Sequence, residues 1–70
     1  MDIRRLVGLN VQRLRQEKGW SQEELAFRSG LHRTYVSGVE RGKRNPTVVV
    51  LERLARSLGV DPVELLRAAD

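Results

Sequence analysis

The sequence contains no cysteine and only one histidine, His32. Without cysteine the chain can form neither disulfides nor thiolate metal sites, and a lone imidazole has no partner ligand at a suitable spacing. Stability must therefore come from packing of the chain against itself. We expect no metal and no other cofactor.

Long apolar runs and aromatic residues are also scarce. The first residues, MDIRR, lead into no sustained apolar stretch, so we expect neither a signal peptide nor a membrane span, and we expect a cytoplasmic location. No third aromatic residue continues a surface with Trp20 and Tyr35 on which the bases of a single-stranded nucleic acid could stack. No serine has a histidine and an acid at a defensible spacing, and no glycine-rich phosphate loop is present. We predict no catalytic residue and no enzyme activity.

Positive charge is the one compositional excess. Thirteen Lys and Arg residues face nine Asp and Glu residues in a chain of 70, a net charge of +4. This length suits one domain, residues 1–70. The excess is local, because residues 28–44 hold five basic side chains and one acidic side chain. Such a cluster favours a polyanionic partner such as nucleic acid, and a solvated basic face is the alternative.

Glycine and proline divide the sequence into five short segments with helical spacing and no strand-like alternation. We therefore predict a compact all-α fold of five helices. The segments run from about residue 3 to 18, 21 to 29, 32 or 33 to 40, 47 to 58, and from 61 onward. Capping signals support the starts, with Ser21 and Glu24 as a capping box and with Thr47 and Asp61 as caps.

Apolar residues at helical spacing define the predicted buried faces. Leu6, Leu9 and Phe27 fit either the core or the surface. The predicted buried set comprises Ile3, Val7, Val11, Leu14, Leu25, Ala26, Leu31, Val36, Val39, Val50, Leu51, Leu54, Ala55 and Leu58. The apolar residues of the last segment are Val63, Leu65 and Leu66.

The second and third segments have the layout of a helix-turn-helix, two short helices joined by a turn with glycine. Val36 and Val39 can anchor the third segment, while Arg33, Thr34 and Ser37 face elsewhere. Gly38 adds little bulk where a duplex would approach. We therefore predict a helix-turn-helix formed by helices 2 and 3.

At these residues the chain resembles the lambda repressor-like helix-turn-helix proteins of the Cro/repressor (xenobiotic response element) type. The resemblance covers nearly the whole chain. It is carried by LR at 14–15, GWSQEELA at 19–26, GLHRTYVS at 30–37, ERGKRNP at 40–46 and LARSLGV at 54–60. It implies a lambda repressor-like DNA-binding domain that regulates transcription, with repression as the expected outcome and double-stranded DNA as the partner.

The resemblance also implies roles for individual residues. The third helix would read bases through Arg33, Thr34 and Ser37, and the planar fork of Arg33 suits guanine. Phosphate contacts would come from Gln22, His32, Tyr35, Lys43, Arg44 and Asn45. Arg15 and Glu40 would form a structural ion pair. The operator itself does not carry over, because Arg33-Thr34 and Gly38 depart from the reading helices of better-studied members.

Two further interpretations concern partners. The last helices carry Val48, Val49, Val63, Leu65 and Leu66, more apolar surface than a short terminal helix needs, which predicts a homodimer through helices 4 and 5. Ordinary core packing is the alternative. The rival function is a protein-interaction module of the same fold, such as an antitoxin or a partner of the transcription machinery. We expect no small-molecule ligand.

Overall fold

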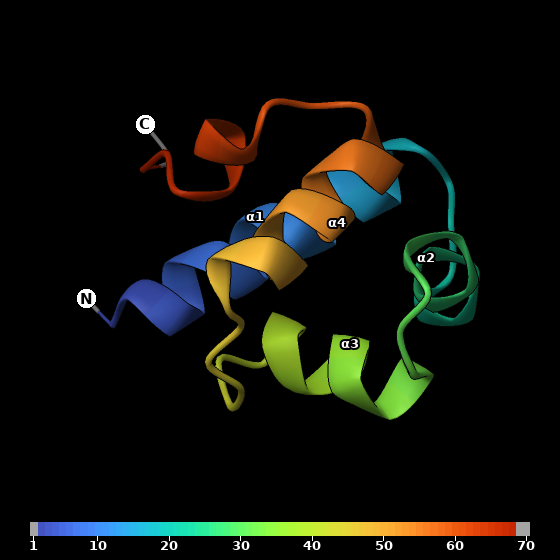
Figure 1. Ribbon diagram of the computed structural model, residues 1–70, viewed down its shortest axis with the longest axis horizontal. Helices are drawn as coiled ribbons and strands as arrows, with labels where there is room; N and C mark the ends of the chain where they lie inside the picture. The colour runs from blue at the N-terminus through green and yellow to red at the C-terminus, as the bar shows by residue number, and fades with distance from the viewer. Residues whose placement is uncertain (1, 69–70) are drawn as a thin grey trace.

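The computed structural model describes residues 2–68, and within them it contains four α-helices and one short 3₁₀ helix (Figure 1). The α-helices are α1 (Ile3–Glu17), α2 (Gln22–Ser29), α3 (Arg33–Glu40) and α4 (Val48–Leu58). The 3₁₀ helix η1 (Pro62–Leu65) follows α4. The predicted all-α class is confirmed, and the prediction of five helices is wrong. Across this stretch, none of the helices has the length and apolar character to cross a membrane.

In place of the predicted fifth helix the chain forms the single turn η1, whose end is anchored to α1. It begins as predicted, with the Asp61 carboxylate accepting a hydrogen bond from the Val63 amide at 2.9 Å. The buried Asn10 side chain of α1 then donates through Nδ2 to the carbonyl oxygens of Leu65 and Arg67, both at 2.9 Å. These two bonds tie the end of η1 and the residues that follow it to α1.

Side-chain caps begin the helices where the sequence predicts them. Ser21 Oγ accepts a hydrogen bond from the Glu24 amide at 3.0 Å, and Thr47 Oγ1 accepts one from the Val50 amide at 3.2 Å. The predicted capping box is made only in this direction, because the Glu24 carboxylate accepts from Arg28 Nε at 2.7 Å instead.

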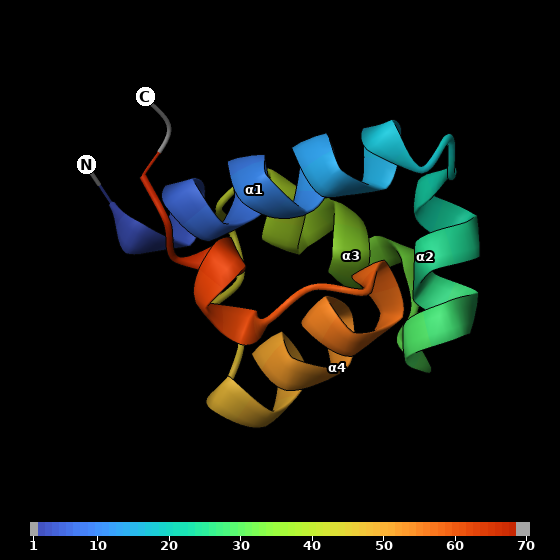
Figure 2. The ribbon, with the colours of Figure 1, turned by 90° about the horizontal axis from the view of Figure 1, so that it is seen from above.

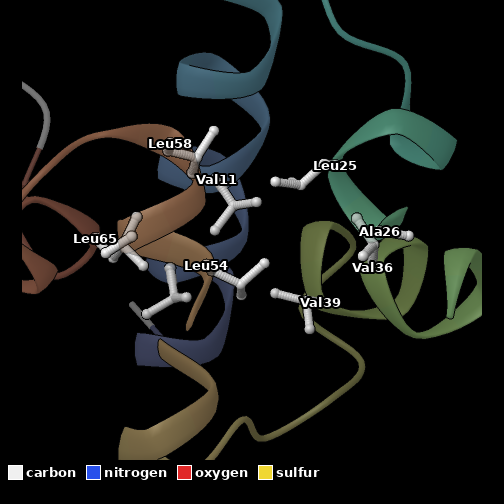
Figure 3. Close-up of a cluster of buried hydrophobic side chains, with 10 residues drawn as sticks. Val11, Leu25, Ala26, Val36, Val39, Leu54, Leu58 and Leu65 are labelled. Carbon is white, nitrogen blue, oxygen red and sulfur yellow. The ribbon is translucent and has the colours of Figure 1, made fainter. Parts of the chain in front are cut away.

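The core lies where α1, α2, α3, α4 and η1 meet (Figure 3). Apart from Leu65 of the last segment, the fully buried apolar residues were all in the predicted set: Val7, Val11, Leu25, Ala26, Val36, Val39, Leu54, Ala55 and Leu58. The predicted burial of Ile3 is wrong, since it is 56% exposed at the first position of α1, at the edge of the packed region. Phe27, which the sequence left open, lies on the surface of α2.

Helices α1 and α3 pack against each other (Figure 2), and Gly8 of α1 lies close to the backbone of α3. A Cβ atom at position 8 would collide with the carbonyl oxygen of Val39 and would lie 2.7 Å from that of Glu40. Both oxygens belong to the backbone of α3, so neither can turn aside as a side chain could. The position of α3 against α1 therefore depends on the absence of a side chain at Gly8.

We predict that Gly8→Ala destabilises the protein by about 3 kcal/mol, because overpacking against fixed backbone forces the two helices apart. Chemical unfolding followed by circular dichroism measures the change. Arg13→Ala on the exposed side of α1 is the matched control and should shift stability by no more than about 0.5 kcal/mol. Equal stability of the Gly8→Ala variant and the control would contradict the prediction, because it would show that α1 and α3 can move apart at little cost.

Candidate nucleic-acid interface

A tight turn at Gly30 sets the angle between α2 and α3. Gly30 ends α2 in the left-handed conformation, with φ of 70°, which glycine adopts without strain. The Leu31 amide then donates to the carbonyl of Ala26 at 2.9 Å, closing the turn. Buried Val36 and Val39 anchor α3 to the core, so that its opposite side is left facing solvent (Figure 1). This is a helix-turn-helix arrangement, made from the helices that the sequence indicated.

The structure brings Arg15 of α1 and Glu40 of α3 together as a bidentate pair. Arg15 Nε lies 2.7 Å from Glu40 Oε2, and Arg15 Nη2 lies 3.0 Å from Glu40 Oε1. The side chains are 11% and 2% exposed, so both charges are largely removed from water. Arg15 Nη1 also donates to the carbonyl of Trp20 at 2.7 Å. The hydrogen bond to Glu40 raises the pKa of Arg15, and the pair fixes α1, α3 and the start of α2 together.

Gln22, at the first turn of α2, joins this network. Its Nε2 donates to Glu40 Oε1 at 3.0 Å, so one of its two amide hydrogens is directed into the fold. The family resemblance implied a phosphate contact for Gln22 and did not anticipate this bond. The second hydrogen is available to an acceptor outside, and the bond to Glu40 holds the amide group in one orientation.

The predicted base-reading residues lie on the outer side of α3. Arg33 and Thr34 are exposed at the first turn, and Ser37 is half-buried one turn later. His32 is exposed at the N-cap position, and Tyr35 is half-buried at the flank of the helix. Arg33 can therefore present its fork of donors to an external acceptor.

The segment 41–47 between α3 and α4 supplies a second group of predicted contacts, since Lys43, Arg44 and Asn45 are all exposed. Lys43 and Arg44 are absent from the ion pairs found in residues 2–68, so their charge is not neutralised within that range. We call this segment, the outer side of α3 and the start of α2 together the α3 face. In the same range no cluster of His, Cys, Asp and Glu could hold a metal ion.

Arg41 is a candidate that the sequence did not assign. It follows α3 directly, is exposed, and its Nε donates to the carbonyl of Ser37 at 3.3 Å. It follows Ser37 by four residues, so helical spacing puts both on the same side of the helix. Its place in the basic cluster was the signal that could have identified it.

Comparison with known proteins gives a consistent result. A helix-turn-helix family model, HTH_3, matches residues 11–65. The chain is 56% identical over 70 residues to an uncharacterized HTH-type transcriptional regulator, y4dJ, of Sinorhizobium fredii, covering 100% of this chain and 91% of that protein. It is 47% identical over 66 residues to the control protein C.BamHI of Bacillus amyloliquefaciens, covering 93% and 82% of the two chains.

A solved structure with the same arrangement is the restriction-modification controller protein C.AhdI of Aeromonas hydrophila. The TM-score is 0.86 at 50% sequence identity, and the match covers 89% of this chain and 94% of that one. The fold and the helix-turn-helix are therefore shared over nearly the whole of both chains.

We predict that Glu40→Ala destabilises the protein by about 3–5 kcal/mol, because it leaves the buried Arg15 charge without a partner. Replacing both residues, Arg15→Met with Glu40→Leu, should recover most of that loss, since no buried charge remains. Urea unfolding measures both.

The matched control is Glu17→Ala, which removes only the exposed pair with Arg13 and should cost about 0.5 kcal/mol or less. If Glu40→Ala behaved like this control, the Arg15 and Glu40 pair would not be the link that holds the helices.

Proposed function

The chain belongs to the helix-turn-helix family HTH_3 and is a DNA-binding regulator of transcription, and from this premise we propose that it reads the major groove of double-stranded DNA with α3. The observation that supports this most is the α3 face, where the exposed Arg33 and Thr34 stand beside the exposed basic segment 41–47. A helix of this size fits the major groove of B-form DNA, where each base pair shows a distinct pattern of donors and acceptors.

The proposed role of each residue follows from the chemistry of its side chain. Arg33, Thr34 and Ser37 contact base edges, with Arg33 bidentate to a guanine. Gln22, His32, Tyr35, Lys43, Arg44 and Asn45 contact phosphates, which sets affinity and position on the duplex. The start of α2 adds backbone amides that favour a phosphate. The Arg15 and Glu40 pair positions the helices and touches no DNA.

The biological outcome that we propose is repression, because a protein seated on promoter DNA blocks transcription without any further surface. We propose that residues 1–70 act as one domain, that the activity needs no catalysis, and that it takes place in the cytoplasm, where bacteria such as the sources of the relatives keep their DNA.

We also propose that the protein binds as a homodimer through α4 and η1. Val48 and Val49 of α4 are 79% and 61% exposed, and Val63 of η1 and Leu66 just after it are 50% and 45% exposed, so apolar surface is concentrated on α4 and the neighbouring η1 region. Leu65, predicted from sequence to share this surface, is fully buried in the core and has no part in it. A two-fold dimer would set two α3 helices about 34 Å apart, one turn of the duplex.

Selection of bound duplexes from a random DNA pool tests the function. We predict a palindromic motif with half-sites about one helical turn apart.

Two variants test the assigned roles. Arg33→Ala should flatten the base preference at one position of each half-site. Lys43→Ala should weaken binding to all sequences alike and reduce by about one the slope of the log binding constant against log salt concentration. A folded protein that enriches no motif would favour the protein-interaction alternative, and equal behaviour of the two variants would refute the assignment of roles.

Light scattering over a range of concentrations tests the dimer. Val49→Glu should raise the dimer dissociation constant at least about tenfold, because the charge would be buried in an apolar interface. Phe27→Glu makes the same change at an exposed apolar position on α2 and should leave the dissociation constant unchanged. A wild-type chain that stays monomeric at high concentration would rule the dimer out.

A further inference from the structure

Gly38 lies in the middle of the outer side of α3 and is nevertheless buried. It follows Thr34 by four residues and precedes Arg41 by three, so helical spacing puts all three on one side of the helix. Thr34 and Arg41 are exposed, whereas Gly38 is covered. The sequence suggested that this glycine leaves room for a duplex, and the structure shows that another part of the chain fills the room.

The covering group is the side chain of Arg44. A Cβ atom at position 38 would lie 2.7 Å from Arg44 Cγ, 3.2 Å from Nε and 3.5 Å from Cδ. The side chain of Arg44 therefore runs across α3 through the space that any other residue at position 38 would occupy. The collision would fall near the base of the arginine side chain, so the whole side chain would have to move.

Two contacts hold Arg44 in that position. The Lys43 amide donates to the Gly38 carbonyl at 2.8 Å, which turns the segment after α3 back onto the helix. The guanidinium carbon of Arg44 lies 5.6 Å from the centroid of the Tyr35 ring, one turn before Gly38. An arginine over the face of an aromatic ring gains a cation–π attraction and keeps its planar donors in one orientation.

Arg44 in this position takes the place of a side chain that α3 itself lacks. Its guanidinium has no carboxylate partner among the ion pairs of residues 2–68. The Arg44 side chain passes over Gly38, the helical neighbour of Thr34, and its guanidinium lies by the Tyr35 ring. A free guanidinium fork in that place matches the two acceptors of guanine in the major groove.

We infer that Gly38 is a positioning residue that determines sequence preference through Arg44. Without a side chain at position 38, Arg44 lies along α3 and reads a guanine edge, in addition to any phosphate it meets. This inference rests on the proposed function and goes beyond it, because it moves Arg44 from setting affinity to setting sequence choice. It also makes position 38 a place where a single methyl group changes the operator.

The test compares motifs selected from a random duplex pool by the wild type, Gly38→Ala, Arg44→Ala and the control Ser57→Ala, which changes a side chain on α4. Alanine favours a helix over glycine, so Gly38→Ala should remain folded, as a thermal melt will show. We expect Gly38→Ala and Arg44→Ala to lose preference for the same guanine, by about tenfold, while the rest of the motif persists. Ser57→Ala should select the wild-type motif.

A second measurement needs no DNA. The Tyr35 ring should shift the NMR signals of the Arg44 side-chain protons upfield in the wild type, and this shift should vanish in Gly38→Ala. Tyr35→Phe, which keeps the ring, should preserve both the shift and the guanine preference, whereas Tyr35→Leu should lose both.

The outcomes separate the two proposals. A motif left unchanged by Gly38→Ala, or an equal loss of affinity for every sequence, overturns the role of Gly38 and leaves the proposed function standing. A folded wild-type protein that selects no motif overturns the proposed function and this inference with it.

Discussion

The buried ion pair between Arg15 and Glu40 is the interaction on which the rest of the structure depends. It joins the last turn of α1 to the last residue of α3, and its further bonds reach the Trp20 carbonyl and the Gln22 amide at the start of α2. A buried pair of this kind adds little net stability over apolar packing, but it tolerates only one relative placement of the groups that it joins. The geometry of the helix-turn-helix is therefore fixed by electrostatics as well as by the apolar core.

Close packing supplies the second constraint. The missing side chain at Gly8 lets the backbones of α1 and α3 meet, and Val36 and Val39 pull one side of α3 into the core. A short helix held on one side by packing and at its end by an ion pair keeps the residues of its opposite side, which Arg44 crosses at Gly38, in a fixed orientation. This is the state that a reading helix needs before it meets a duplex, since order already present in the free protein lowers the cost of binding.

Local signals in the sequence were enough to predict most of this fold. Glycines and the caps Ser21, Thr47 and Asp61 marked the helix starts and ends, and helical spacing identified the residues of the core. The contact that anchors the last segment could not be predicted, because Asn10, which donates to the carbonyl groups of Leu65 and Arg67, lies more than 50 residues away in the chain. The sequence also did not separate Leu65, which is buried, from Val63, which is 50% exposed.

The candidate site was predictable in composition and less so in geometry. The exposed positions of Arg33, Thr34 and Lys43 follow from helical spacing and from the basic cluster. The bond between Gln22 and Glu40 and the crossing of Arg44 over Gly38 depend on how separate segments fold against each other, which no local pattern encodes. The roles of these residues toward DNA remain predictions.

The claim that the α3 face is the surface that meets DNA is tested most directly by an NMR titration of the labelled protein with a duplex that it binds. We predict that the backbone amides of Gln22, of residues 33–37 and of residues 43–45 shift most, while those on the outer side of α1 stay in place. Shifts concentrated on α1 or around Phe27, with the amides of α3 unmoved, would contradict the account.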